Sequence, residues 1–317
     1  GDFVSGQGNY VKNNDMGDIY IDYVVNGIKL QRPVKVIVDG GNGVGGPYLT
    51  AILRRLGCEV IDMFCEPDGD FPNQHPDPAI AKNMEALSKA VIENKYELGI
   101  GLDGDADRIG VVDEQGKLLL GDQILNILAR DYLKHNPGKK IIADVKCSMN
   151  LFNDIIKYGG EPIMYKTGHA NIKMYMQEKK VEFAGEMSGH IFLADRYLGF
   201  DDAIYVSCRF CEIVAQTLNP VSSFLADQPK LFNTPELHTS CPDAKKFEVV
   251  AKVCEEFKKE GYEVNDIDGA RITFSDGWGL IRASNTTPII VTRYEAITEE
   301  RMNEIKGLIE GKIQKYL

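Results

Sequence analysis

Three aspartates alternate in the segment DGDADR, which directly follows the apolar stretch ELGIGL. Asp103, Asp105 and Asp107 place three carboxylates at the end of one predicted strand, where they repel one another unless a cation lies among them. Oxygen ligands suit a hard ion, so the segment predicts a Mg²⁺ site with Arg108 beside it. An EF-hand loop is excluded, because Arg108 occupies its glycine position and the flanking segments have the pattern of strands. The remaining alternative is an acidic turn that only caps two solvated strands.

A second segment, GEMSGH, alternates three polar side chains in a glycine-flanked loop after the strand pattern VEFA. Glu186 is an acceptor, Ser188 offers a hydroxyl and His190 offers an imidazole. This combination is suited to binding sugar hydroxyls and to moving a proton. The alternative is an ordinary hydrogen-bonding surface loop.

A third segment, RASNTTP, places an arginine, hydroxyls and an amide in a turn between two strand patterns. Arg282 offers a forked guanidinium for phosphate, the turn adds further donors, and Arg293 follows on the next strand. A Ser/Asn/Thr turn that caps its own backbone is the alternative. Lys146 and His169 also follow predicted strands, at the edge where open α/β sheets bind ligands.

A glycine-rich loop after the first strand imitates a dinucleotide-binding fingerprint. Gly41, Gly43 and Gly46 form the pattern GxGxxG between a strand and a helix, and Asp62 lies near the end of the next strand. Tight strand–helix turns rich in glycine also occur in α/β folds that bind no cofactor. The loop alone therefore leaves both interpretations open.

Composition restricts the partners of the chain. The 317 residues include 36 basic and 47 acidic side chains, for a net charge of −11, which disfavours nucleic acid and anionic membranes. No apolar run reaches the ~18 residues of a membrane span, and the first residues lack the pattern of a signal peptide. Seven cysteines, an odd number, indicate reduced thiols in a cytosol-like compartment. Cys208 and Cys211 lie in an apolar helical pattern, which predicts buried core thiols rather than a zinc site.

Strand and helix patterns alternate regularly from Val34, after about two dozen polar and weakly periodic residues. The strands VKVIVD, CEVIDMF and ELGIGLD alternate with helices, and the same order repeats from GDQILNILARDYLKH to the Cys208 helix. This alternation predicts parallel sheets covered on both faces. SSFLADQPKLFNTPEL is predicted as loop and linker. The last part combines two helices with the strands ARITF, GWGLIRAS and PIIVTRYEA, which indicates an α+β unit.

In this order, the three polar segments resemble those of the α-D-phosphohexomutases, specifically the bacterial phosphomannomutase/phosphoglucomutase branch. DGDADR is similar to the metal loop of that family, GEMSGH to its sugar-recognition loop and RASNTTP to its phosphate-binding loop, while DVKCS and KTGHANIK match its third domain. The resemblance implies two consecutive three-layer α/β domains followed by a smaller α+β domain. It places the domains at 15–117, 118–229 and 230–317, with 1–14 as the remnant of a further N-terminal domain or linker. The matching glycine loop of the family binds no dinucleotide.

The resemblance implies an isomerase that acts by phosphoryl transfer in carbohydrate metabolism, in the cytoplasm. Such an enzyme interconverts hexose 1-phosphate and hexose 6-phosphate through a hexose 1,6-bisphosphate and a phosphoserine, which makes it a phosphoprotein. The family carries that serine in a Ser-His-Asn-Pro-like loop, and no Ser-His-Asn occurs here. The chain is therefore expected to be a truncation that is inactive alone. Its expected partners are hexose monophosphates and the 1,6-bisphosphate, with neither nucleic acid nor membrane.

The resemblance also assigns roles to residues. It implies that Asp103, Asp105 and Asp107 hold Mg²⁺, and that Arg108 and His190 are catalytic. The residues that it implies for substrate binding are Lys146, His169, Glu186, Met187, Ser188, Gly189, His190, Arg282, Ala283, Ser284, Asn285, Thr286 and Arg293. Two other functions stay open: a magnesium-dependent sugar phosphatase, which needs an aspartate nucleophile near the chain start, and a non-catalytic sugar-phosphate-binding protein.

Overall fold

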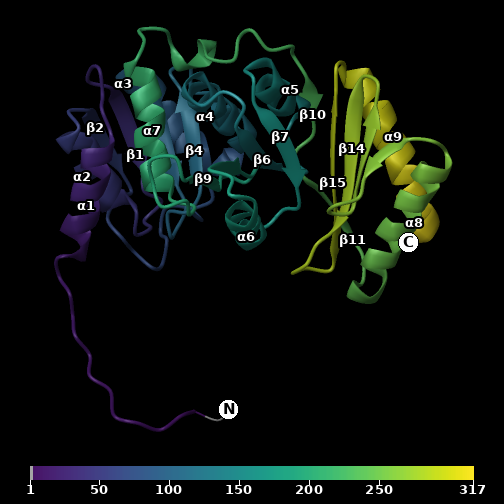
Figure 1. Cartoon of the computed structure of the whole chain (residues 1–317), viewed down its shortest axis with the longest axis horizontal. Helices are drawn as coiled ribbons and strands as arrows, with labels where there is room; N and C mark the ends of the chain where they lie inside the picture. Colours follow the sequence, from purple (N-terminus) through teal and green to yellow (C-terminus); the bar gives the residue numbers. More distant parts are fainter. Residues whose placement is uncertain (1–2) are drawn as a thin grey trace.

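The computed structural model describes residues 3–317 and contains three β-sheets that follow one another along the chain (Figure 1). The first two sheets and their helices form one continuous body, and the third sheet lies at the other end with two helices on its far side (Figure 1). Two α/β units followed by an α+β unit confirm the predicted fold class.

The first sheet has the strand order β2-β1-β3-β4-β5. Its central strand β1 is parallel to both neighbours, so that Val36 lies opposite Val60 and Leu98. β4 and β5 run antiparallel, which corrects the fully parallel sheet expected from the sequence. Only the short metal loop separates β3 from β4, whereas a parallel return needs a crossover of a dozen or more residues. The strands are β1 (Lys35–Asp39), β2 (Glu59–Met63), β3 (Leu98–Leu102), β4 (Ile109–Asp113) and β5 (Leu118–Leu119).

Helices cover both faces of this sheet. α3 (Glu85–Asn94) follows a 3₁₀ turn, η1 (Ala81–Met84), and buries Leu87 and Val91 against Ile37 of β1. α2 (Gly46–Arg55) packs on the opposite face, and α1 (Met16–Gly27) packs on α2. The first two dozen residues, described from sequence as weakly periodic with no helix predicted, thus include the regular helix α1.

The second sheet has the order β7-β6-β8-β9, with β6 parallel to both β7 and β8. β9 is antiparallel to β8, because only the short GEMSGH loop connects the two strands. The elements are α4 (Gly121–His135), β6 (Lys140–Asp144), α5 (Met149–Lys157), β7 (Glu161–Tyr165), α6 (His169–Lys179), β8 (Phe183–Gly185), β9 (Ile191–Leu193) and α7 (Ala203–Ala215).

One hydrophobic core runs through both α/β units, and α7 contributes to it from the side of the second unit. Cys208 and Cys211 on α7 are fully buried and free, which confirms the prediction of core thiols. Within residues 3–317, no helix is both long enough and apolar enough to cross a bilayer.

The third sheet is antiparallel, with the order β10-β15-β14-β13-β12 and β11 added beside β15. After the 3₁₀ turn η2 (Val221–Ser223), the elements are β10 (Phe232–Asn233), β11 (Leu237–Ser240), α8 (Asp243–Lys259), β12 (Glu263–Asn265), β13 (Ala270–Phe274), β14 (Gly277–Ala283), β15 (Ile289–Ala296) and α9 (Glu299–Tyr316). α8 and α9 cover one face through Val253, Phe257, Ile305 and Ile309, which pack on Ile281 and Tyr294.

The other face of the third sheet meets the second unit and carries two arginines. Arg271, Leu280 and Arg293 lie side by side across β13, β14 and β15. Trp278, next to them on β14, packs with Leu280 against Val145 at the end of β6. Both arginines and the tryptophan are at most 2 % exposed, so charged groups line this interface.

Candidate functional site

The three aspartates of DGDADR lie in the tight loop between β3 and β4, and their carboxylates converge. One oxygen from each of Asp103, Asp105 and Asp107 lies within 4.8 Å of the others. The backbone amides of Asp107 and Arg108 donate to Oδ1 of Asp103 at 3.0 and 3.1 Å, which fixes the shape of the loop. A set of oxygen ligands at this spacing fits a hard divalent cation, so the loop is a metal-binding cluster.

The electrostatics of the loop also favour a cation. Burial, together with the charges of Asp103 and Asp105, raises the pKa of Asp107 to about 6 against the opposing effect of His190. Arg108 neutralises the negative charge of Asp103 but of neither other aspartate in the loop. Its Nε lies 2.8 Å from Asp103 Oδ2, and its Nη1 lies 3.1 Å from Asp77 Oδ2. Asp105 is exposed and open to an incoming ion.

The glycine-rich loop packs directly against the metal loop. The amide of Val44 donates to the Gly104 carbonyl at 3.0 Å. A Cβ on Gly43 would lie 2.6 Å from that same oxygen, and one on Gly45 would lie 2.4 Å from Cβ of Ala106. Gly43 and Gly45 therefore permit close contact between two loops, which accounts for the central glycine of GxGxxG without a dinucleotide.

The GEMSGH loop between β8 and β9 docks on the start of β4, beside the metal cluster. The amide of Ile109 donates to the Gly189 carbonyl at 3.2 Å. Gly189 has φ of +100°, and a Cβ there would lie 2.6 Å from the Ile109 oxygen, so only glycine fits. This contact places His190 Nδ1 3.5 Å from Asp107 Oδ1.

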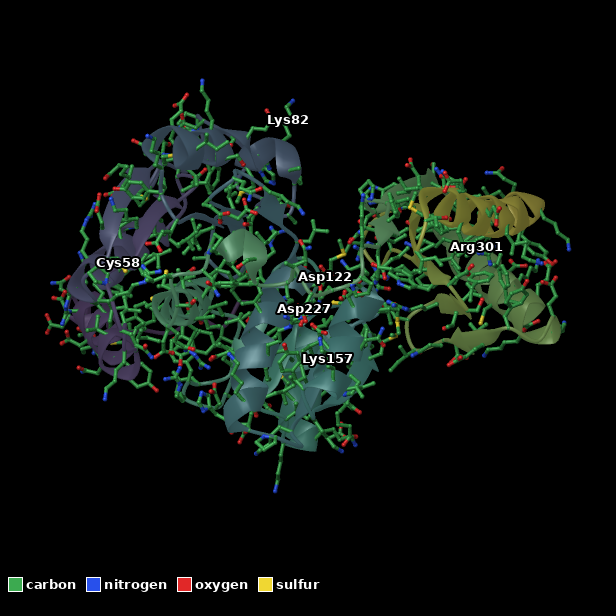
Figure 2. The ribbon with its side chains drawn as sticks, turned by 90° about the horizontal axis from the view of Figure 1, so that it is seen from above. Cys58, Lys82, Asp122, Lys157, Asp227 and Arg301 are labelled. Atoms are coloured by element: carbon green, nitrogen blue, oxygen red, sulfur yellow. The ribbon has the colours of Figure 1, made fainter. Side chains whose placement is uncertain are left out.

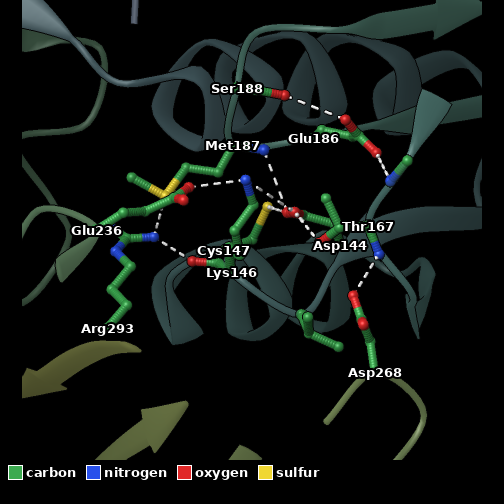
Figure 3. Close-up of polar contacts among 12 residues, drawn as sticks. Asp144, Lys146, Cys147, Thr167, Glu186, Met187, Ser188, Glu236, Asp268 and Arg293 are labelled. Carbon is green, nitrogen blue, oxygen red and sulfur yellow. Dashed lines mark hydrogen bonds and ion pairs between the residues drawn. The ribbon is translucent and has the colours of Figure 1, made fainter. Parts of the chain in front are cut away.

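Glu186 and Ser188 of the same loop form a buried acceptor site (Figure 3). Glu186 accepts hydrogen bonds from the Gly168 amide at 2.5 Å and from the Ser188 hydroxyl at 3.1 Å. Burial and the nearby Asp144 raise the pKa of Glu186, while the Gly168 amide opposes them. Asp144 in turn accepts from the amide of Met187 and the hydroxyl of Thr167, both at 3.1 Å, and so fixes the backbone of both loops.

Asp201, which precedes α7, contacts three basic side chains of the site. Its Oδ2 lies 3.0 Å from Nδ1 of His169 and 3.2 Å from Nδ1 of His190, and Lys173 donates to its Oδ1 at 2.8 Å. Burial alone would raise the pKa of Asp201, but these three partners outweigh burial and lower it well below its usual range. The imidazole rings of His169 and His190 are stacked, with centroids 5.1 Å apart.

Arg282 reaches this region through a carboxylate shared with the second unit. Asp268 Oδ2 accepts from Arg282 Nε at 3.2 Å. The same oxygen accepts from the Thr167 amide at 3.0 Å (Figure 3). Because Gly168 binds Glu186, a continuous series of contacts links Arg282 to the GEMSGH loop.

The turn after Arg282 is closed on itself. The Ser284 hydroxyl accepts from the amides of Thr286 and Thr287 at 3.3 and 3.2 Å and contacts the Thr287 hydroxyl at 2.8 Å. Asn285 and Thr286 are exposed, whereas Ala283 is buried in the core beneath α8 and α9. Arg282, Asn285 and Thr286 are thus side chains of this segment with donors left for an anion.

Lys146 and Arg293 are both buried and already bound (Figure 3). Lys146 donates to Glu236 at 2.7 Å and lies 3.9 Å from Asp144. Burial would lower the pKa of Lys146, but these carboxylates outweigh it and raise that pKa, so the ammonium stays charged. Arg293 contacts the Lys146 carbonyl and the sulfur of Met187, which places it behind Lys146 rather than at the turn after Arg282.

A cleft of about 670 Å³ opens between the three sheets next to these groups. Arg108 lines it from the first unit, Lys146 and Ser188 from the second, and Glu236 and His238 from the third. Its size suits a small polar metabolite.

Of the predicted site residues, Arg108, Lys146, Met187 and Ser188 line this cleft, and several residues that hold the predicted groups were not predicted. Asp201 contacts the predicted His169 and His190, and Asp144 contacts the predicted Met187 and Lys146. Asp268 and Glu236 contact one predicted residue each, Arg282 and Lys146 respectively. Asp201 adjoins Asp202, whose carboxylate caps α7 by accepting from the Tyr205 amide, so the pair resembles an ordinary helix start in sequence.

Family models for phosphoglucomutase/phosphomannomutase match three consecutive parts of the chain. Alpha/beta/alpha domain II matches residues 18–116, alpha/beta/alpha domain III residues 120–232 and the C-terminal domain residues 236–311.

Individual relatives agree with these models. A phosphoglucomutase of Neisseria meningitidis is 44% identical over 96% of this chain and 67% of its own length, and a phosphomannomutase/phosphoglucomutase of Pseudomonas aeruginosa is 40% identical over 99% and 67%. The crystal structure of a phosphoglucomutase/phosphomannomutase family protein from Burkholderia thailandensis is 40% identical, with a TM-score of 0.88 over 95% of this chain and 64% of that one. The chain thus spans about two thirds of the length of the relatives it matches.

Proposed function

Because this chain belongs to the phosphoglucomutase/phosphomannomutase family, we propose that it forms the metal- and sugar-phosphate-binding part of a phosphohexomutase. The reaction is the interconversion of a hexose 1-phosphate and a hexose 6-phosphate through the 1,6-bisphosphate. One observation carries the proposal: the metal loop of the first unit contacts the GEMSGH loop of the second, and side chains from all three units, Arg108, Lys146 and Glu236, line the cleft beside them.

We propose Mg²⁺ as the ion of the aspartate cluster, because Asp103, Asp105 and Asp107 offer oxygen ligands only. Bound there, the ion neutralises charge that develops during phosphoryl transfer. The seven free thiols support a cytoplasmic location, where they stay reduced.

We assign the other roles in the reaction to individual residues of the chain. Arg108, held by Asp103 and Asp77, binds the transferring phosphoryl group at the wall of the cleft. Glu186 and Ser188 bind sugar hydroxyls. Burial would lower the pKa of His190, but Asp201, Asp107 and Glu186 outweigh it and raise that pKa, which favours the protonated imidazole that a general acid needs.

The substrate phosphate that does not react is proposed to bind Arg282, with Asn285 beside it. Lys146 and His169 complete the sugar site, and Met187, Gly189 and Arg293 act by fixing its backbone.

The phosphate role of Arg282 is tested by titration calorimetry with glucose 1-phosphate. Arg282→Ala is expected to weaken binding by about 1.5–3 kcal/mol, the range of charge-assisted hydrogen bonds, and Arg282→Lys to recover part of the loss. Arg301→Ala is the control, because Arg301 lies on α9 and pairs with Asp276 and Glu304 (Figure 2). Unchanged affinity in Arg282→Ala would show that the turn only caps itself.

We also propose that these 317 residues, which contain no Ser-His-Asn segment, do not turn over alone. A coupled assay with glucose 1-phosphate, its 1,6-bisphosphate and Mg²⁺ is expected to show no product beyond background. Turnover that stays with the protein through repurification contradicts this proposal, and release of inorganic phosphate instead identifies a phosphatase.

A further inference from the structure

Two histidines and two aspartates converge at the metal loop. One ligand atom from each of Asp107, His169, His190 and Asp201 lies within 4.8 Å of the others. They come from the metal loop, the start of α6, the GEMSGH loop and the segment before α7, so the fold and not a local motif creates the cluster.

Three of the six separations among these ligand atoms are close to those of a tetrahedral metal site. Zn²⁺ binds histidine nitrogen and carboxylate oxygen at about 2.0–2.1 Å, which puts neighbouring ligand atoms about 3.3 Å apart in a tetrahedron. Here His169 Nδ1 lies 3.0 Å from Asp201 Oδ2, His190 Nδ1 lies 3.2 Å from the same oxygen, and His190 Nδ1 lies 3.5 Å from Asp107 Oδ1.

The most buried nitrogen of the cluster lacks a hydrogen bond. His190 Nδ1 is excluded from solvent, and among residues 3–317 no group meets it with the direction that a hydrogen bond requires. A buried polar atom without a partner is costly, and a metal ion among the four ligands would satisfy it. Lys173 does not block the position, because it donates to Oδ1 of Asp201 and leaves Oδ2 facing the two imidazoles.

We propose that Asp107, His169, His190 and Asp201 form a second metal site, selective for imidazole-binding transition ions such as Zn²⁺, which shares Asp107 with the aspartate cluster. Imidazole nitrogen favours such ions over Mg²⁺, whereas the aspartate cluster offers oxygen alone. The ion enters past His169, whose side chain is half exposed. An ion there occupies Nδ1 of His190, so it prevents that nitrogen from carrying a proton; this last consequence rests on the proposed function, and metal binding itself does not.

The test uses the full chain, stripped of metal and kept reduced with a phosphine that does not bind metal. Cobalt(II) is titrated in the presence of excess Mg²⁺ and followed by visible absorption. We expect the strong ligand-field band of four-coordinate cobalt, which one equivalent of Zn²⁺ abolishes. His169→Gln and His190→Gln are each expected to lower the cobalt affinity at least about tenfold. His169 is half exposed, so its variant keeps the test usable if His190→Gln does not fold.

Two matched controls separate this site from the other metal-binding groups. His135→Gln changes an exposed histidine at the end of α4, and Asp105→Asn changes the aspartate cluster without touching the histidine cluster. Both are expected to keep the cobalt affinity within twofold. Cobalt binding that survives both cluster histidine variants, that is lost in Asp105→Asn, or that shows thiolate charge transfer would overturn the proposal. Phosphate binding at Arg282 is measured separately, so the two proposals fail independently.

Discussion

Asp268 is a single carboxylate with partners in two units, since it binds Arg282 of its own sheet and the Thr167 amide of the second unit. We expect Asp268→Asn to weaken glucose 1-phosphate binding by roughly three- to tenfold, because the amide holds a guanidinium less firmly than a carboxylate does. Calorimetry measures this loss. Asp266→Asn is the control, since Asp266 lies on the surface and pairs with Lys258. Equal effects of the two substitutions would mean that Asp268 does not position Arg282.

Asp39, at the end of β1, makes stability depend on pH. Its carboxylate is 1 % exposed, and burial raises its pKa to about 6, against the hydrogen bonds from the Gly41 amide and Gln74. A raised pKa in the folded state means that the contribution of Asp39 to stability is present below about pH 4 and is lost as the pH rises through about 6.

Asp39→Asn removes this titration. Relative to the unsubstituted chain, we expect the variant to gain about 1–3 kcal/mol of unfolding free energy near pH 8, and much less near pH 4. Urea denaturation at the two pH values measures the difference. Asp70→Asn, in an exposed loop, is expected to leave both values unchanged, and a gain for Asp39→Asn that is equal at both pH values would contradict the assignment.

At the scale of elements, the contact between the glycine-rich loop and the metal loop sets the shape of the metal cluster. Gly43→Ala places a Cβ 2.6 Å from the Gly104 carbonyl oxygen. The nearest atoms are all backbone atoms, which cannot rotate away as a side chain could. We expect a loss of about 1–3 kcal/mol of stability from this overpacking, together with weaker Mg²⁺ binding. Gly69→Ala is the control, since nothing lies within 4 Å of its added methyl group. Denaturation and calorimetry on both variants decide, and a Gly43→Ala variant as stable as Gly69→Ala would refute the contact.

Elements with strong periodicity were predictable from sequence, and elements that depend on partners were not. α4, α8 and β13–β15 lie close to their predicted segments. α1 was missed because its sequence mixes glycine and aspartate with apolar residues, and it is stabilised by contacts such as that of Tyr20 with Tyr48 of α2. β9, β10 and β12 are two or three residues long, and their pairing with longer strands defines them.

The site shows the same division. Asp103, Asp105 and Asp107 form a local motif, so sequence alone indicated a metal. Asp201, Asp268 and Glu236 could not be found in this way, because they lie 32, 101 and 90 residues from the partners His169, Thr167 and Lys146. Only the three-dimensional fold brings these pairs together.

At the scale of the whole molecule, the third unit lies beside the second (Figure 2) and meets it through polar contacts around the packed side chains of Trp278 and Leu280. Arg271 donates to the Val145 and Cys147 carbonyls, and Glu295 accepts from the Met149 amide at 3.0 Å. Beside them is a cavity of about 350 Å³, lined by Asp122, Asn126, Arg293 and Glu295. Each of these four has a buried side-chain atom that lacks a hydrogen-bond partner within residues 3–317. Water can satisfy such groups when the interface opens, so opening it costs less than exposing an aliphatic core.

The position of Trp278 turns this interface into a built-in optical reporter. It is the single tryptophan of the chain, and it lies 1 % exposed on the interface face, with the Arg271 guanidinium 3.7 Å from its ring centroid. Intrinsic tryptophan fluorescence therefore reports on the interface between the second and third units rather than on an average over the molecule. In a urea titration, we expect the emission to shift to the red before the far-ultraviolet circular dichroism changes, because the interface between the units separates before the helices unfold. Coincident transitions would instead mean that the third unit unfolds together with the other two.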